Sequence, residues 1–164
     1  MNVIVNVAKD WAIGKDGDLL AHIKADMQFF RKHTTGNVVV MGRKTLESFP
    51  GQNPLPDRVN IVITRNEDYH KDGVTIVHSV EEAVKECEKY TDKAIYVIGG
   101  ETIYRQMLSY CDTAYITKMD TTFEADTYFP NLDQDAQWEM AEEGEPQEFS
   151  KGTFRFTTYK RKTV

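Results

Sequence analysis

The stretch "NVVVMGRKTLESF", residues 37–49, decides the fold. Its first six residues form a near-continuous apolar run, which is typical of a strand buried on both faces of a parallel sheet. Gly42 then lets the backbone approach a ligand closely. A helix opens at Arg43, Lys44 and Thr45, and its free N–H groups favour an anion. This order of elements predicts an α/β protein that binds its ligand beyond the carboxyl ends of its strands.

Two further strand ends have the same character. One strand ends in Gly99 and Gly100, directly before an expected helix, and another ends in Thr64 and Arg65. A hydroxyl beside a guanidinium suits a phosphate monoester, which arginine binds through a bidentate fork. Two glycine-lined cradles could hold a pyrophosphate, and the extra arginine could hold a third phosphate. The combination favours NADP over NAD.

The rest of the chain alternates between strands and helices. Helices are expected at 79–90, where Ser79 and Glu82 form a capping box, and at 101–110. Alternation predicts a largely parallel sheet, with the last two strands as an antiparallel addition. We therefore expect one three-layer α-β-α domain, 1–164, around an eight-stranded, mostly parallel mixed sheet. The expected strands are 2–8, 38–42, 59–64, 74–78, 94–98, 113–119, 138–143 and 153–161.

Composition excludes several classes of protein. The net charge of -6 disfavours a general nucleic-acid binder, and no apolar run of membrane-spanning length occurs. The N-terminus lacks signal-peptide features, and Cys87 and Cys111 make no CxxC, so we expect a cytoplasmic protein with reduced thiols. No metal is expected, because the four histidines have no ligand spacing. The stretch 123–150 has nine acidic residues and no Lys or Arg, which indicates a solvated face rather than an acidic interaction module.

Familiar nucleotide and hydrolase motifs are missing. The sequence has no GxGxxG and no GxxxxGK[ST], so it fits neither a standard Rossmann dehydrogenase nor a P-loop NTPase. It also has no GxSxG, which argues against an α/β-hydrolase.

Asp26 is an unusual residue within "GDLLAHIKADMQFF" (17–30). Ile23, Asp26 and Phe30 fall at i, i+3 and i+7, so the carboxylate shares an apolar helical stripe. The simpler interpretation is that an acid favours the start of a helix. The alternative is a functional acid whose pKa is raised by lost hydration and which accepts paired N–H donors.

Six segments run in order through nearly the whole chain: "AIGKDGDLL…AD" (12–26), "VMGRKTLESF" (40–49), "PLPDRVNIVITR" (54–65), "YVIGGETIY" (96–104), "YITKMD" (115–120) and "EADTYFP" (124–130). On these segments the chain resembles dihydrofolate reductase of the bacterial type. The resemblance implies reduction of 7,8-dihydrofolate to tetrahydrofolate by NADPH, in support of one-carbon metabolism and thymidylate and purine synthesis.

The resemblance also implies roles for particular residues. Asp26 matches the acid that binds the pterin ring, Thr117 the threonine bonded to that acid, and Arg58 the arginine that grips the glutamate α-carboxylate. Residues 10–23 match a mobile loop over the nicotinamide, in which Leu19 has a catalytic role. Further substrate-binding positions are Ile4, Val5, Met27, Phe30, Ser48, Phe49, Leu55 and Ile98. Cofactor-binding positions are Asn6, Ile13, Gly14, Leu19, Gly42, Arg43, Lys44, Thr45, Ile63, Thr64, Arg65, His78, Ile98, Gly99, Gly100, Glu101, Thr102, Ile103, Tyr104 and Gln106.

The sequence leaves open which of Lys44, His78 and Arg65 dominates at the 2'-phosphate. Antifolate inhibitors are expected to share the substrate pocket, and the chain is expected to be a monomer.

The chain departs from the family before the acid. The family has Pro-Trp and a second Pro there, whereas this chain has Leu20, Ala21 and Lys24. The family's indole N–H holds a water near the acid, which Ala21 cannot do. Either the pocket is wider and wetter, or another side chain compensates, for which His22 is a candidate. The loop between Ser48 and Arg58 is also longer than in some relatives.

Two rival functions remain. A ribosylaminopyrimidine reductase of riboflavin synthesis would share the fold and NADPH, but Asp26 together with Arg58 favours folate. A non-catalytic nucleotide-binding protein would bind NADPH without dihydrofolate-dependent oxidation.

Overall fold

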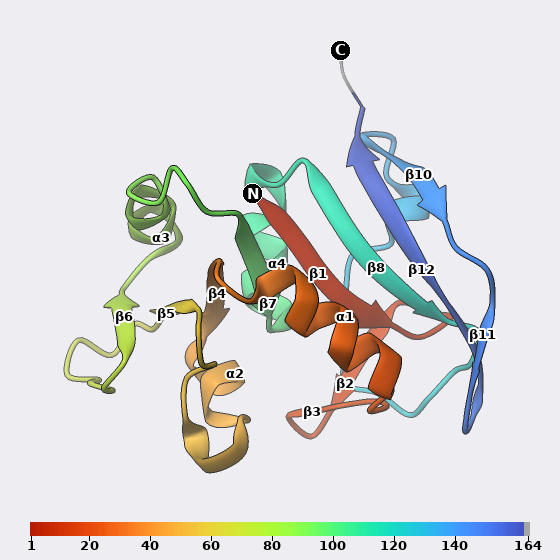
Figure 1. Cartoon of the computed structure of the whole chain (residues 1–164), viewed down its shortest axis with the longest axis horizontal. Coiled ribbons are helices and arrows are strands. Elements are labelled where there is room, and N and C mark those ends of the chain that lie inside the picture. The colour runs from red at the N-terminus through yellow and green to blue at the C-terminus, as the bar shows by residue number, and fades with distance from the viewer. Residues whose placement is uncertain (163–164) are drawn as a thin grey trace.

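The main sheet of the protein is a single layer of eight strands with one short addition. The structure is a computed structural model that describes residues 1–162. The strand order is β10-β12-β8-β1-β7-β4-β5-β6 (Figure 1). The bounds are β1 Asn2–Val7, β4 Val38–Gly42, β5 Val59–Ile63, β6 Val74–Val77, β7 Ile95–Gly99, β8 Thr113–Met119, β10 Trp138–Glu143 and β12 Gly152–Arg161.

Strand direction follows the expectation from sequence. From β8 through β1, β7, β4 and β5 to β6, neighbours run parallel. β12 is antiparallel to both β8 and β10. The mostly parallel sheet with an antiparallel C-terminal pair is therefore confirmed. The last two residues of the expected domain, 163 and 164, lie outside the described residues.

One strand of this sheet was missed. β11 (Gln147–Phe149) pairs with the start of β12, and only residues 150 and 151 separate the two strands. Three residues are too few to produce a recognisable alternation, so only pairing with β12 defines this strand.

Helices cover both faces of the sheet, which makes three layers. α1 (Lys24–Thr34) and α2 (Arg43–Glu47) pack on one face, where Phe30 and Leu46 join the cluster around Met41. α3 (Val80–Cys87) and α4 (Glu101–Met107) pack on the other face. In Figure 1, α1 crosses in front of β1, and α4 lies behind the sheet. Short 3₁₀ turns follow at η1 (Pro50–Gln52), η2 (Leu108–Tyr110) and η3 (Leu132–Gln134).

The helices expected at 79–90 and 101–110 both form, each slightly shorter than predicted. Ser79 caps α3, and its hydroxyl accepts the N–H of Glu82 at 3.1 Å. The Glu82 carboxylate accepts the N–H of His78 at 2.9 Å, one residue before the partner that a standard capping box uses. None of the helices in residues 1–162 is both long enough and apolar enough to cross a membrane.

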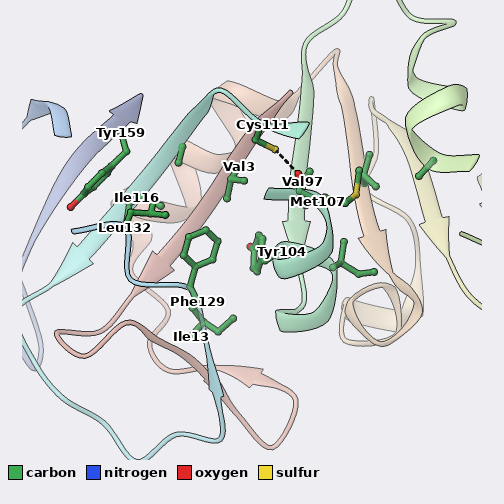
Figure 2. Close-up of a cluster of buried hydrophobic side chains, with 14 of the residues drawn as sticks. Val3, Ile13, Val97, Tyr104, Met107, Cys111, Ile116, Phe129, Leu132 and Tyr159 are labelled. Atoms are coloured by element: carbon green, nitrogen blue, oxygen red, sulfur yellow. Dashed lines mark hydrogen bonds between the residues drawn. The ribbon is translucent and has the colours of Figure 1, made fainter. Parts of the chain in front are cut away.

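The core on the α4 side is rich in aromatic rings. Tyr104 of α4 packs edge-on against Phe129, and Trp11 stacks on Phe129 with ring centroids 6.2 Å apart. Figure 2 shows Tyr104 and Phe129 beside each other in this core, with Val3 and Val97 nearby. The parallel strands are thereby held rigidly, so their carboxyl ends are fixed relative to one another.

The segment expected as a mobile loop contains regular structure. β2 (Ala12–Lys15), β3 (Asp18–Leu19) and β9 (Thr127–Tyr128) form a small antiparallel sheet. These three strands did not emerge from the sequence, because each is at most four residues long.

Candidate active site

Asp26 is the third residue of α1, and its carboxylate turns inward. Ile23 before the helix is buried in the cluster with Met119, whereas Phe30 is partly buried against the cluster around Met41, so both residues expected on the apolar stripe pack inward but in different clusters. Burial raises the pKa of the Asp26 carboxyl, while hydrogen bonds from Thr117 and Asn6 oppose that rise. The carboxylate is therefore poorly hydrated but held by protein donors, as a functional acid would be.

Two neighbouring strands supply those donors. The Thr117 hydroxyl of β8 donates to Asp26 Oδ1 at 2.6 Å. The Asn6 amide of β1 donates to Asp26 Oδ2 at 3.0 Å. The contact between Thr117 and Asp26 was expected, whereas the bond from Asn6 was missed. Alternation along "IVNV" puts Asn6 on the same face as Ile4, but only the register between β1 and β8 reveals what it meets.

Apolar side chains gather beside the acid. Phe30, Phe49, Leu55 and Ile98 are partly buried against the cluster on the α1 and α2 face of the sheet. The shared cluster brings together four of the predicted wall residues from four separate segments. Met27 has 52% of its surface exposed and lies at the open side.

Other predicted substrate positions lie at the edges of this group. Ile4 is buried, and its carbonyl accepts the Tyr104 hydroxyl at 3.0 Å. Val5 points to the opposite face of β1, where it packs against the α4-side core. Ser48 is exposed, and its hydroxyl donates to the Thr45 carbonyl at 2.6 Å.

Arg58 is anchored by two hydrogen bonds from its guanidinium to the protein. Nε donates to the Pro56 carbonyl at 2.8 Å, and Nη1 donates to the Thr34 hydroxyl at the end of α1 at 3.1 Å. Burial and the neighbouring Arg31 lower the pKa of Arg58. The Nη2 hydrogens and the second hydrogen of Nη1 are left for a planar acceptor such as a carboxylate.

The two glycine-lined strand ends lie next to each other, since Met41 of β4 pairs with Gly99 of β7. Gly42 and Gly100 are the N-caps of α2 and α4, and no side chain caps either helix. A Cβ at Gly42 would come within 3.1 Å of Ile103. Gly99 has φ +132°, and a Cβ there would come within 3.4 Å of the Thr45 hydroxyl. Backbone, rather than side chains, therefore lines this double strand end.

The third strand end includes His78. Its Nδ1 lies 2.8 Å from the Thr64 carbonyl, so the ends of β5 and β6 are joined there. Arg65 is exposed beside them. Ile63 packs toward the α3 side of the sheet. His78, Thr64 and Arg65 thus form one polar group at the edge of the strand ends.

Arg43, one of the expected cofactor-binding residues, is engaged by neighbouring side chains. Its Nε donates to Glu47 at 3.2 Å, and its guanidinium lies 4.4 Å from the centre of the Tyr69 ring. Lys44 is exposed. The basic start of α2 is therefore partly neutralised by its own helix.

The remaining predicted cofactor positions divide between core and surface. Ile103 and Tyr104 are buried in the core, while Thr102 and Gln106 are exposed. The Glu101 carboxylate accepts the backbone N–H of Tyr128 on β9. The remaining three lie on the small sheet. Ile13 and Gly14 are buried in β2, whereas Leu19 in β3 has 53% of its surface exposed.

Ala21, which stands where the family has tryptophan, lines a cleft of about 540 Å³ between residues 20–25 and residues 147–151. His22 is directed toward the surface, since its Nε2 lies 3.3 Å from Asp18 and its side chain is 56% exposed. His22 is therefore not placed to replace the indole at Asp26.

A mostly parallel sheet with backbone-lined strand ends beside a buried, hydrogen-bonded carboxylate is typical of an α/β enzyme that takes a nucleotide cofactor. A sequence model described as Dihydrofolate reductase matches residues 1–161. The chain belongs to the dihydrofolate reductase family.

Individual relatives match along most of their length. The chain is 35% identical to dihydrofolate reductase of Staphylococcus haemolyticus, covering 98% of this chain and 95% of that protein. It is 37% identical to dihydrofolate reductase of Bacillus subtilis, covering 92% of this chain and 88% of that protein. A solved structure of dihydrofolate reductase from Enterococcus faecalis, complexed with NADP(H) and RAB-propyl, superimposes with a TM-score of 0.87 at 36% identity, covering 99% of this chain and 96% of that one.

Proposed function

We propose that this chain reduces 7,8-dihydrofolate to 5,6,7,8-tetrahydrofolate with NADPH, and so supports one-carbon metabolism. Membership of the family over residues 1–161 and the NADP(H)-bound relative support the reaction and its cofactor. The observation that carries the proposal within this chain is the inward carboxylate of Asp26, held by Thr117 and Asn6.

Asp26 orients the substrate ring. Each of its oxygens accepts one hydrogen bond from the protein, and a carboxylate oxygen has lone pairs for a second. The 2-amino group and adjacent ring N–H of a pterin form a matching pair of donors. An ionised Asp26 also favours a positive charge on the ring electrostatically, while N5 takes its proton from water.

The strand ends fit a dinucleotide. Gly42 and Gly99 lack the Cβ atoms that would come close to Ile103 and to the Thr45 hydroxyl, and α2 and α4 begin there without side-chain caps. The backbone at Gly42, Gly99 and Gly100 would hold the pyrophosphate, and the group of Thr64, Arg65 and His78 would hold the 2'-phosphate. When bound, NADPH supplies the hydride that C6 of the pterin receives.

The rest of the substrate meets residues in two groups. Phe30, Phe49, Leu55 and Ile98 enclose the pterin and p-aminobenzoyl rings and exclude water from them. The N–H groups of Arg58 that remain after its two bonds to the protein receive the α-carboxylate of the glutamate.

We also infer that the protein works as a cytoplasmic monomer that antifolates inhibit. Residues of one chain suffice for every group named above. Cys87 and Cys111 are both free, which suits a reducing compartment. Light scattering of the purified protein tests the monomer, since a dimer would double the mass.

The proposal is tested with Asp26→Asn. The variant keeps the shape of the side chain but exchanges a charged acceptor for an amide, which loses about 3 kcal/mol from two charge-assisted hydrogen bonds to the pterin. We expect kcat/KM for dihydrofolate at neutral pH to fall about 100-fold. Asp92→Asn is the control, because Asp92 is exposed and precedes the amino end of β7.

Turnover of Asp26→Asn within about threefold of the parent would contradict the assignment, since that is under half the energy of one pKa unit. Assays of the unaltered protein with dihydrofolate and with a ribosylaminopyrimidine separate the two reductases. NADPH binding without oxidation of either substrate would indicate a non-catalytic protein.

A further inference from the structure

Each oxygen of the Asp26 carboxylate accepts a hydrogen bond from a side chain on a neighbouring strand. Asn6 and Thr117 are register partners on the parallel strands β1 and β8, so they project from the same face of the sheet. Thr117 donates to Oδ1 at 2.6 Å and Asn6 donates to Oδ2 at 3.0 Å. Because both donors are mounted on rigid neighbouring strands, the plane of the carboxylate is set by the sheet as well as by α1.

The charge of Asp26 fixes the orientation of the Asn6 amide. Its Nδ2 has to face an ionised carboxylate, because the reversed amide would bring two oxygens together. Asn6 Oδ1 is the only buried side-chain polar atom without a hydrogen-bond partner among residues 1–162. Because no donor in residues 1–162 binds Oδ1, the bond from Nδ2 to the carboxylate is the hydrogen bond that sets the orientation of the Asn6 amide.

No cation within the described part of the chain helps to keep Asp26 ionised. On α1 itself, Lys24 is exposed, and none of the salt bridges within residues 1–162 includes Asp26. From α4, Tyr104 faces the acid, but its hydroxyl donates to the Ile4 carbonyl. From β1 and β8 come only the neutral Asn6 and Thr117.

The two donors are not equivalent. The Thr117 hydroxyl can donate to a carboxylate or accept from a carboxylic acid, so it serves both protonation states. The Asn6 nitrogen can only donate, and its bond to a charged carboxylate oxygen is stronger than its bond to the carbonyl oxygen of a carboxylic acid, so it favours the ionised state. Burial works in the opposite direction and raises the pKa of the acid.

We propose that Asn6 is a positioning residue, whose amide keeps Asp26 ionised and turned so that one lone pair of Oδ2 stays available to the substrate ring. The inference rests on the proposed reduction of dihydrofolate. On this proposal Asn6 compensates for the tryptophan that Ala21 replaces, since its amide brings an N–H to Asp26 directly.

The test measures Asp26 itself before any reaction. Asn6→Leu preserves the approximate shape of the side chain and removes both polar groups. The titration of Asp26, followed by carbon NMR of the labelled carboxyl in the ligand-free protein, is expected to move to higher pH in this variant. Asn2→Leu is the matched control, because Asn2 lies on the same strand and its amide binds the Ile95 carbonyl instead. The control is expected to leave the titration of Asp26 unchanged.

Kinetics then separate positioning from packing. At a pH where Asp26 of the variant is partly protonated, we expect kcat/KM of Asn6→Leu to be about tenfold below that of the parent. A loss of about tenfold corresponds to one charge-assisted hydrogen bond. The ratio should recover as the pH rises and Asp26 ionises in both proteins. A deficit of constant size across the pH range would show packing alone and overturn the proposal.

An unchanged Asp26 titration in Asn6→Leu would likewise overturn the role of Asn6. Asn6→Ala carries the same test if Asn6→Leu does not fold. Because the titration needs no substrate, it stays informative if the protein proves not to reduce dihydrofolate. In that case the proposed function fails, while the role of Asn6 in keeping Asp26 ionised is still supported.

Discussion

Arg58 offers the sharpest test of how this chain recognises its substrate. Three N–H hydrogens of its guanidinium remain after the bonds to the Pro56 carbonyl and the Thr34 hydroxyl. Those two bonds hold the plane in place before any ligand arrives, so little side-chain entropy is lost on binding. Arg58→Met keeps most of the apolar stem and removes the fork.

The expected magnitude follows from the hydrogen bonds that this substitution removes. A bidentate carboxylate makes two charge-assisted hydrogen bonds, each of about 1.5 kcal/mol at the low end that suits a partly exposed group. Without them the substrate binds about 3 kcal/mol more weakly, which raises the KM for dihydrofolate more than about 100-fold. Folding should be little affected, by under about 1 kcal/mol, because Thr34 still donates to the Phe30 carbonyl at 2.8 Å.

Two substrates make the assay specific. Steady-state rates, followed by loss of NADPH absorbance, are compared for dihydrofolate and for dihydropteroate, which lacks the glutamate. Arg58→Met should raise KM for dihydrofolate only. Arg31→Met is the control for the loss of a nearby positive charge, because Arg31 is exposed and its charge lowers the pKa of Arg58. We expect this control to change the KM for dihydrofolate by less than about threefold. An equal rise in KM for both substrates, or an unchanged KM for dihydrofolate, would refute the reasoning.

Two further outcomes follow from the structure. Ala21→Trp should place an indole beside the cleft of about 540 Å³ and lower the inhibition constant of trimethoprim; identical constants for the two proteins would exclude the effect. Burial raises the pKa of Cys87 to about 11 and that of Cys111 to about 12, and Cys111 Sγ also donates to the Met107 carbonyl (Figure 2). Since a raised pKa keeps a thiol protonated, both should resist alkylation near neutral pH in the folded protein, as mass spectrometry can check; modification as fast as in urea would contradict this.

Local patterns were sufficient for the elements around the site. Continuous apolar runs predicted the buried parallel strands, because a strand covered on both faces tolerates few polar residues. Ser79 and Glu82 predicted the start of α3, because capping depends on residues within one turn. Asp26 on an apolar stripe was sufficient to mark a candidate acid.

Other features depended on segments that are distant in the chain. β11 exists only through its pairing with β12, and β9 pairs with β2, which lies near the other end of the chain. His22 was the wrong candidate for compensation, because it faces Asp18 at the surface.

The sequence by itself determined the order of functional groups along the chain: an acid at the start of a helix, glycines at two strand ends and a basic third strand end. Only the tertiary structure decided which groups hold that acid. The parallel register of β1 and β8 sets Asn6 opposite Thr117 and brings both to Asp26, although they lie 20 and 91 residues from it in the chain. Periodicity describes which face a side chain occupies, but register across a sheet is a long-range property that fixes what it meets there.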